Sequence, residues 1–403
     1  MKITAEQDFS CMGQIALPHE IVWGWSATEA LVRFIAERRI TKPLIVTDPG
    51  IVKAGVLESV LEAIRTSKAN ATVFNQVTAE PGLETVSAAI ECGRKAGVDA
   101  VFGVGGGSSL DVAKIAGVLL AHKAVIANCL GMGNMPGKGL PLALIPTTTG
   151  TGSEVTQVSV LTDESDGGAK KVAYDPALLA DLVVVDPYLS MDLPPRITAI
   201  TAIDALSHAI EPFVSNRRNP MADTFAKEAI RRLSRYIRPA VLRGASCPEA
   251  RYNLAIGATL AGLALSCGGA GATHALNYPL AVQFHLGHGD SIARLLPFVM
   301  RANICSDPGR YAMLADLMGA VASGVSLSER ERAEASVAFV DDLCCDIGVQ
   351  IGIRDIVQND KDFEMWADIA LQYSAHNIKN NPRLLCKEDI VEVYRNAYRR
   401  IDE

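Results

Sequence analysis

The segment Ala100–Lys114, AVFGVGGGSSLDVAK, decides the fold, because an apolar run passes through three consecutive glycines into a helical pattern. Glycines let the chain turn without obstruction from Cβ atoms, and the free N–H groups at a helix start favour a diphosphate. We therefore predict a strand, a tight turn and a helix that binds a dinucleotide. A plain tight turn is the alternative, because Ser108 stands where the usual G-x-G-x-x-G fingerprint ends in glycine.

Five further apolar runs flank this segment, at residues 20–24, 43–48, 71–74, 142–145 and 182–186. Stretches of helical length separate them, which predicts βαβ units and a parallel sheet. Strand patterns stop after Pro194-Pro195, and helical periodicity follows. Ser326 and Glu329 form a capping-box pattern that predicts one of the later helix starts. We predict an α/β dinucleotide-binding domain over residues 1–190 and an all-helical domain over residues 191–403.

Two polar loops follow other predicted strands. Asp48 opens the sequence Asp-Pro-Gly, and an acidic residue at a strand's carboxyl end can bind an adenosine ribose and repel a 2′-phosphate, which favours NAD. A simple turn is the alternative for Asp48. Residues 146–154, PTTTGTGSE, gather hydroxyls and glycines that suit ribose, amide and phosphate groups. A polar loop without a specific role is the alternative here.

Four of the seven histidines lie between residues 204 and 288, in a segment that begins with Asp204. Asp204 and His208 are four residues apart in a helical segment, so both side chains project from one face. His274, His285 and His288 follow. One carboxylate with three imidazoles suits a divalent transition ion such as Fe, Zn, Mn, Co or Ni. Unrelated histidines on helix surfaces are the alternative.

Composition argues against several classes of protein. The formal net charge of −7 and the pI near 5.6 disfavour a nucleic-acid-binding surface. Nine cysteines without a C-x-x-C pair, and an N-terminus without signal-peptide features, predict reduced thiols and a cytoplasmic location. Residues 254–273 carry no charge and are long enough to span a bilayer, but their five glycines favour a buried helix ending near Gly268.

Taken together, these motifs resemble those of the iron-containing (group III) alcohol dehydrogenase family, in order and spacing, over nearly the whole chain. They are Gly24 after the first strand, Thr47-Asp48, the GGGSSLDVAK loop, the PTTTGTGSE loop, DALSH, the two later histidine motifs and Asn381-Pro382-Arg383. The resemblance implies a dinucleotide-binding domain joined to a helical domain, the dehydroquinate synthase-like architecture. It also implies an active site in the cleft between the two domains.

The resemblance assigns roles to particular residues. The implied metal ligands are Asp204, His208, His274 and His288, and the implied diphosphate-binding residues are Gly106, Gly107 and Ser108. Asp48 would face the adenosine ribose, and Thr147, Thr148 and Lys170 would line the nicotinamide side. The implied cofactors are NAD(H) and a divalent metal, with Fe(II) ahead of Zn(II).

Three residues depart from the family pattern. Tyr278 stands four residues after His274, where many members have a histidine near the reacting groups. Tyr278 or His285 is therefore the candidate proton donor. Pro212, four residues after His208, predicts a lost backbone hydrogen bond and a bend in that helix. Glu80 replaces a common asparagine near the cofactor, so we expect an altered cofactor affinity.

We therefore predict a metal-dependent, NAD(H)-linked oxidoreductase that interconverts a primary alcohol and an aldehyde by hydride transfer. Its expected partners are a small-molecule substrate and further copies of the chain, but neither nucleic acid nor a membrane. One alternative is a metal- and NAD-dependent synthase or a sugar- or polyol-phosphate dehydrogenase. The absence of Lys and Arg between residues 252 and 293 argues against the phosphate clamp it needs. A non-catalytic binding protein with this fold is the second alternative.

Overall fold

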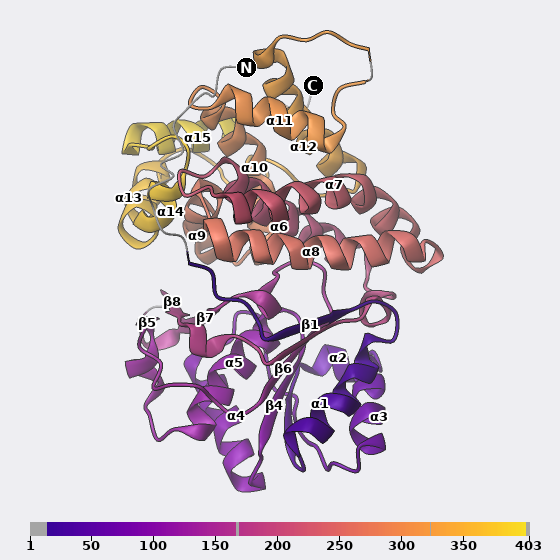
Figure 1. Cartoon of the computed structure of the whole chain (residues 1–403). Helices are drawn as coiled ribbons and strands as arrows, with labels where there is room; N and C mark the ends of the chain where they lie inside the picture. The colour runs from indigo at the N-terminus through magenta and orange to yellow at the C-terminus, as the bar shows by residue number, and fades with distance from the viewer. Residues whose placement is uncertain (1–13, 167–168, 323, 400–403) are drawn as a thin grey trace.

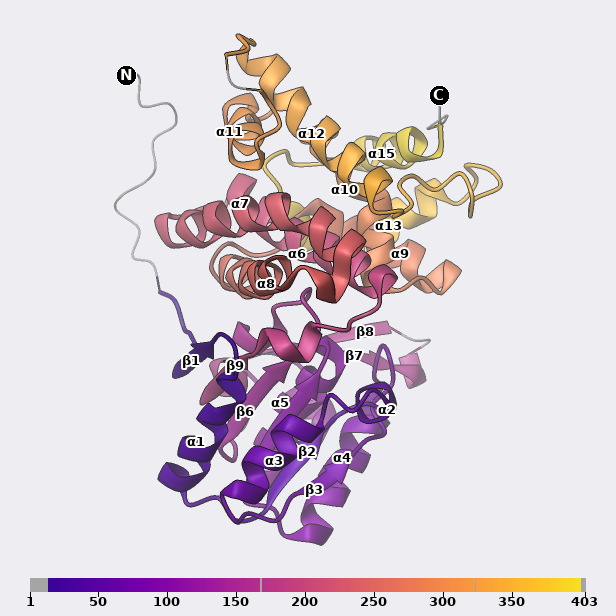
Figure 2. The same ribbon diagram turned by 90° about the vertical axis from the view of Figure 1, so that its right-hand side faces the viewer.

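A computed structural model describes residues 14–166, 169–322 and 324–399 of the chain. An α/β part occupies the lower half of Figure 1 and a helical part the upper half, and Figure 2 shows both parts after a quarter turn. All nine described strands precede residue 190, and the described residues after Pro194 contain helices and loops but no strand. The predicted α/β half and helical half are confirmed, whereas the domain boundary near residue 190 stays a prediction.

The main sheet has six parallel strands in the order β1, β9, β6, β4, β2, β3. Their bounds are Glu20–Trp23 (β1), Pro43–Val46 (β2), Thr72–Phe74 (β3), Ala100–Gly105 (β4), Leu142–Pro146 (β6) and Leu182–Val185 (β9). All six predicted strands therefore join one sheet. The strand order reverses between β2 and β4, because β3 lies on the far side of β2. Open parallel sheets bind ligands at their carboxyl edge beside such a reversal.

Helices cover both faces of this sheet. Ile45 and its neighbours pack against α1 and α3 on one face, whereas Leu44 packs against α4 and α5 on the other. Strands buried on both faces read as continuous apolar runs, which is why the sequence reveals them. The helix bounds are Ala30–Arg38 (α1), Pro49–Lys53 (α2), Glu58–Thr66 (α3), Leu83–Ala96 (α4) and Gly107–Ala121 (α5), and short 3₁₀ helices lie at Ala27–Glu29, Ile126–Cys129, Ser153–Val155, Glu164–Asp166, Pro176–Leu178, Pro187–Ser190 and Gly244–Ser246.

A second sheet contains β5 (Gly131–Met132), β8 (Ala169–Tyr174) and β7 (Val158–Asp163), in that order. The sequence does not predict it, because its short strands carry polar, partly exposed residues and give no continuous apolar run. The buried Lys114 of α5 fixes this sheet in place. Its Nζ donates to the carbonyl oxygen of Val158 at 2.6 Å and to the hydroxyl of Ser153 at 2.7 Å.

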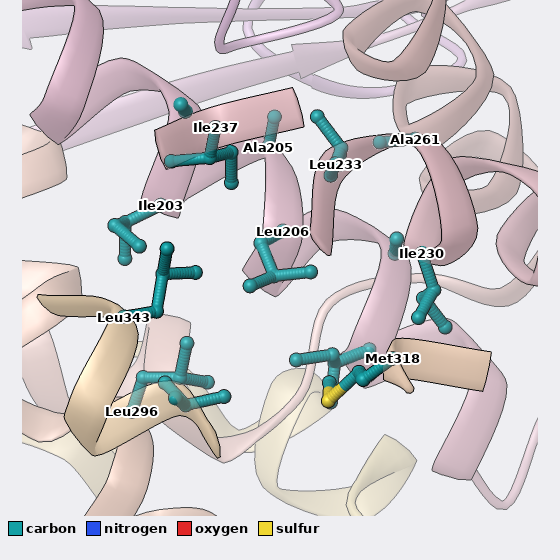
Figure 3. Packing of buried hydrophobic residues seen from close by; sticks show 14 of the residues in the cluster. Ile203, Ala205, Leu206, Ile230, Leu233, Ile237, Ala261, Leu296, Met318 and Leu343 are labelled. Carbon is teal, nitrogen blue, oxygen red and sulfur yellow. The ribbon is translucent and has the colours of Figure 1, made fainter. Parts of the chain in front are cut away.

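The helical part is built around α6. Its buried side chains pack against α7 and α8 in one apolar cluster, and Figure 3 shows Leu206, Ile230 and Ala261 within it. The helix bounds are Pro195–Val214 (α6), Pro220–Arg243 (α7), Pro248–Gly268 (α8), Ala272–Phe284 (α9), His288–Asn303 (α10), Pro308–Met318 (α11), Glu329–Asp346 (α12), Phe363–Tyr373 (α13), Ala375–Asn380 (α14) and Lys387–Arg399 (α15).

Two parts of this helical half are apolar and long enough to cross a membrane: α6, and α8 with α9 as a bent pair. The apolar window of α6 is 83% buried inside the protein, as in the core helix of a globular domain. As predicted, α8 ends at Gly268. A bend of 107° separates α8 from α9 and directs the start of α9 towards α6. Pro212 lies inside α6, which continues to Val214, and the bend predicted there stays a prediction.

Candidate active site

Four side chains from three helices converge in the helical half. Asp204 and His208 lie one turn apart in α6, His274 lies in the first turn of α9, and His288 is the first residue of α10. One ligand atom from each lies within 4.8 Å of the others. Nε2 of His288, His208 and His274 lies 3.5, 3.6 and 3.9 Å from Oδ1 of Asp204. The structure thus brings together the four residues predicted as metal ligands.

The atoms of this cluster suit a shared cation. Nε2 of His208 lies only 3.0 Å from Nε2 of His274. Oδ1 of Asp204 is buried and has no hydrogen-bond donor among the residues that the structure describes. A buried carboxylate oxygen without a partner is costly, and a bound cation removes that cost. The donor set of one carboxylate and three imidazoles therefore fits a divalent transition ion.

Glu211, one turn after His208 in α6, orients His274. Its carboxylate accepts hydrogen bonds from Nδ1 of His274 at 2.7 Å, from the N–H of Gly271 at 2.7 Å and from the N–H of Thr273 at 2.6 Å. With the proton on Nδ1, Nε2 of His274 keeps its lone pair on the side of Asp204. Glu211 also satisfies two N–H groups at the start of α9, so the same carboxylate fixes both the helix and the imidazole.

Burial and neighbouring charges set the protonation states of this cluster. Burial opposes charge on Asp204, but the three histidines hold the pKa of its carboxyl below the ordinary value. Burial lowers the pKa of His208 to about 4. For His274 burial again opposes charge, but Glu211 raises the pKa of its imidazole above the ordinary value. At neutral pH Asp204 is therefore ionised and His208 neutral, the forms in which these groups bind a metal.

The predicted dinucleotide residues gather at the carboxyl edge of the main sheet, at the reversal between β2 and β4. Asp48 follows β2 and accepts hydrogen bonds through Oδ1 from the N–H groups of Gly50 at 2.8 Å and Ile51 at 3.0 Å. Asp48 therefore forms an Asp-Pro-Gly turn, which was the alternative to a ribose-binding role. Its Oδ2 faces β4, since a Cβ on Gly105 would lie 3.3 Å from it.

The start of α5 is open to a ligand. Gly106 precedes the first turn, and no side chain caps the free N–H groups there. A Cβ on Gly107 would lie 2.8 Å from Cγ2 of Thr151, and one on Gly106 would lie 3.3 Å from Thr148, so the turn packs closely on the threonine loop. Ser108 is half-buried in this first turn. The free N–H groups and the helix dipole fit the phosphates of a dinucleotide.

The threonine loop, residues 146–154, connects this edge to the helical half. Thr147 donates its N–H to the carbonyl of Gly105 at 3.0 Å, and its Oγ1 is buried without a partner among the described residues. A Cβ on Gly150 would lie 2.7 Å from Cβ of Thr201, three residues before Asp204. Thr259 of α8 donates to Oε1 of Glu154 at 2.9 Å. One loop therefore touches both the glycine turn and the helix of the metal cluster.

Lys170 and Tyr278 join the second sheet to α9. The N–H of Lys170 donates to the hydroxyl oxygen of Tyr278 at 2.9 Å, so the O–H of Tyr278 remains free to donate. Burial lowers the pKa of Lys170 to about 8, although the amine also pairs with Glu80. Desolvation lowers the pKa of His288 more than the neighbouring charge of Asp204 raises it. Tyr278 lies four residues after His274 in α9, so its contact with Lys170 brings Lys170 to the face of α9 that carries His274.

His285, the other candidate proton donor, lies at the end of α9 in a left-handed conformation with φ of 52°. Its side chain is exposed, and it is not a member of the cluster around Asp204. Of the two candidates, Tyr278 is thus the one held by a hydrogen bond between the two halves of the molecule.

Comparison with known proteins agrees with the assignment of a metal site and a dinucleotide site. The iron-containing alcohol dehydrogenase model matches residues 18–187, and the model of the C-terminal part of that family matches residues 198–398. The chain belongs to the iron-containing alcohol dehydrogenase family. It is 39% identical over 378 residues to long-chain-alcohol dehydrogenase 1 of Geobacillus thermodenitrificans, an alignment that covers 93% of this chain and 94% of that protein.

Two solved structures are similar to the chain over 96% of its length. A 1,3-propanediol oxidoreductase has a TM-score of 0.91 at 31% identity and is covered completely, at 100%. The sulfoacetaldehyde reductase of Bifidobacterium kashiwanohense, in complex with NAD⁺, has a TM-score of 0.86 at 28% identity and is covered at 99%. The chain is accordingly an oxidoreductase that interconverts alcohols and aldehydes with NAD(H) and binds a metal. The predicted family, fold and enzyme class are confirmed.

Three features of this alcohol dehydrogenase escape prediction from the sequence. Glu211 has no motif of its own, and its only signal is an acidic residue three positions after His208 in an apolar helix. The pairing of Lys170 with Glu80 joins β8 to a loop 90 residues earlier, and no sequence pattern relates the two. Asn277 also lies at the cluster, with its Nδ2 3.2 Å from Nδ1 of His288.

Proposed function

We propose that this alcohol dehydrogenase transfers hydride between NAD(H) and a primary alcohol where the threonine loop meets α6. The contact between Gly150 and Thr201 carries this proposal, because it brings the dinucleotide edge against the helix of Asp204 and His208. In the proposed site Asp204, His208, His274 and His288 hold the metal. Fe(II) is the proposed ion and Zn(II) the second choice, since the same donor set accepts both.

The chemistry divides between the metal and the protein. When bound, the metal polarises the substrate oxygen and stabilises the negative charge that develops on it. In our proposal Tyr278 exchanges the proton of that oxygen, because its hydroxyl accepts from Lys170 and keeps its own proton to donate. His285 is the second candidate, at an exposed position. Glu211 keeps His274 in the tautomer that a metal needs.

The proposed dinucleotide site runs along the carboxyl edge of the main sheet. Gly106, Gly107 and Ser108 would hold the diphosphate through the N–H groups at the start of α5. The free Oδ2 of Asp48 would accept from the adenosine ribose. The nicotinamide side would meet Thr147 and Thr148 of the threonine loop and Lys170, which contacts Tyr278 of the helical half. This arrangement would place the ring beside the metal cluster.

An anaerobic assay of NADH consumption with short aldehydes tests the proposal, after reconstitution with Fe(II) or Zn(II). We expect activity that requires metal and is abolished by His274→Ala. His122→Ala is the matched control, because His122 is a half-buried histidine of the α/β half that contacts the carbonyl of Lys138. Metal-loaded protein that binds NADH but reduces no aldehyde, or a His274→Ala variant that keeps its activity, would contradict the proposal.

We further propose that the enzyme is a homo-oligomer. β1 is an edge strand of the main sheet, and the side chains of Trp23 and Tyr188 beside it are 60% and 58% exposed. The rings of Tyr188 and Trp25 contact each other in a tilted arrangement, with their centroids 4.7 Å apart. Exposed aromatic residues beside a free strand edge favour pairing with a second copy. Light scattering should show a dimer or larger assembly, and Trp23→Glu should weaken it.

A cytoplasmic location is also proposed. Cys92, Cys129, Cys247 and Cys267 are free thiols, which suits a reducing compartment. Fractionation of the native host tests this directly, with the enzyme expected alongside cytoplasmic markers.

A further inference from the structure

The pairing of Glu80 with Lys170 places two opposite charges beside the active site, and the proposed chemistry uses only the lysine. Nζ of Lys170 contacts the carboxylate of Glu80 and donates to Oγ1 of Thr162 at 2.8 Å. The side chain of Lys170 is 23% exposed and that of Glu80 is 49% exposed. Through its own backbone Lys170 also contacts Tyr278, the proposed proton donor.

Tertiary contacts hold Glu80 in this position. Its φ is 54°, in the left-handed region that residues with a Cβ rarely adopt. Oγ1 of Thr162 donates to the carbonyl of Glu80 at 3.1 Å, and the N–H of Thr162 donates to the carbonyl of Pro81 at 2.9 Å. The loop before α4 is thus anchored to β7, next to Lys170 on β8. The backbone of Glu80 is therefore fixed beside Lys170, and its carboxylate pairs with the amine.

The carboxylate of Glu80 adds a negative charge that offsets the positive charge of Lys170. Residues 252–293, which carry His274 and His288 of the cluster, contain no Lys or Arg, and Lys170 contacts Tyr278, one turn after His274 in α9. With a divalent ion bound, the charges of the ion, Asp204, Glu211 and Lys170 leave one positive charge. The carboxylate of Glu80 cancels it.

We propose that Glu80 is a specificity-determining residue: by pairing with Lys170 it restricts the enzyme to uncharged alcohols and aldehydes and excludes anionic ones. This inference rests on the proposed function and names the substrate class of the same site. Without Glu80, the Lys170 amine would be free to form a charge-assisted hydrogen bond with a carboxylate or sulfonate. With Glu80 in place, an anionic substrate meets a carboxylate of the same sign and an amine that is already paired.

Two substrates that share a carbon skeleton but differ in charge, one of them also carrying an ester methyl group, test the proposal. The ratio of kcat/KM for succinic semialdehyde to kcat/KM for its methyl ester is measured with NADH in wild type and Glu80→Gln. We expect the ratio to rise about tenfold in Glu80→Gln, because one close unit charge at a partly buried site is removed. The ratio cancels any common loss of folding or cofactor binding. Glu84→Gln is the control, since it removes an equal charge from an exposed position in the first turn of α4.

The double variant Glu80→Gln/Lys170→Met separates the amine from a general charge effect. It should return the ratio towards the wild-type value, because the group that binds the anion is gone. An unchanged ratio in Glu80→Gln overturns the inference. So does a change confined to KM for NADH, which would assign Glu80 to the cofactor, or an equal rise in Glu84→Gln.

A binding measurement distinguishes failure of this inference from failure of the proposed function. Butyrate and butyramide are titrated calorimetrically into the metal- and NAD⁺-loaded protein, which requires no turnover. Glu80→Gln should tighten butyrate about tenfold relative to butyramide, for the same electrostatic reason. If the ratio of the butyrate affinity to the butyramide affinity is the same in wild type and variant, the inference is overturned even if every aldehyde is reduced. A shift in butyrate affinity without any aldehyde reduction would support it and contradict the proposed function.

Discussion

The metal cluster and the dinucleotide edge bind their ligands by opposite means. The cluster uses ionisable side chains, Asp204 and three histidines. Asp204 and His208 are buried in α6, and Glu211 orients His274. The dinucleotide edge uses backbone N–H groups at the start of α5. Its glycines are needed because a Cβ atom there would come too close to the threonine loop. Changes in charge should therefore damage the first region, whereas added atoms should damage the second.

The largest effect should come from Asp204→Asn. The substitution keeps the shape of the side chain but removes the carboxylate around which the three Nε2 atoms gather. We expect activity to fall by more than about 10³-fold, because the metal loses its only anionic ligand. Metal content and NADH fluorescence are measured on the same sample. Loss of metal with unchanged NADH binding is expected, and a metal-loaded, active variant would remove the cluster from the mechanism.

Glu211→Gln should have the next largest effect. The amide cannot supply the charge that stabilises the Nδ1 proton of His274, so we expect metal affinity to fall by about 10–100-fold. Competition with a chelator measures this affinity without any need for turnover. Glu228→Gln is the control, because Glu228 forms an exposed ion pair with Arg232 on α7. Equal affinities in the two variants would mean that Glu211 serves only to hold α9.

Gly107→Ala tests the dinucleotide edge. The added Cβ would lie 2.8 Å from Thr151, so the glycine turn must shift away from the threonine loop. We expect NADH to bind about tenfold more weakly, a loss of about 1.4 kcal/mol, with the metal content unchanged. The matched control is Gly117→Ala in the same helix, where the nearest atom to the Cβ is 3.7 Å away. That variant should bind NADH normally and gain up to about 1 kcal/mol of stability.

The last prediction concerns the pH dependence of the stability of the metal-free protein. Burial lowers the pKa of His208 to about 4, whereas an unfolded histidine titrates near 6.5. As the pH falls from 6.5 towards 4, the unfolded chain takes up a proton that the folded chain does not accept. The free energy of unfolding should therefore decrease across this window and be affected no further below it.

Urea unfolding of wild type and His208→Gln at pH 7.5 and pH 4.5 measures this contribution. The variant should lose about 2 kcal/mol less than wild type between the two pH values. His274 titrates in the opposite sense because its pKa is raised, but it is present in both proteins and cancels in the difference. Identical decreases in wild type and variant would show that His208 is not buried as a neutral imidazole.

Sequence patterns predicted those elements whose signal is local. Buried parallel strands such as β4 give apolar runs, and Gly268 ends α8 where glycine was expected to stop it. The prediction for α12 was wrong by two residues. Ser328 and Glu331, and not Ser326 and Glu329, form the capping box, because the sequence contains both S-x-x-E matches and only the helix register selects one.

The sequence by itself determined the α/β and helical halves, the glycine turn and the four residues that converge on Asp204 as candidate metal ligands. These follow from chemistry and spacing within a few residues, which periodicity and motifs record. Only the tertiary structure decided that Glu211 orients His274, that β7 and β8 form a second sheet, and that Glu80 pairs with Lys170. Each of these contacts joins residues that are distant in the chain or lack an apolar period, so packing alone brings them together.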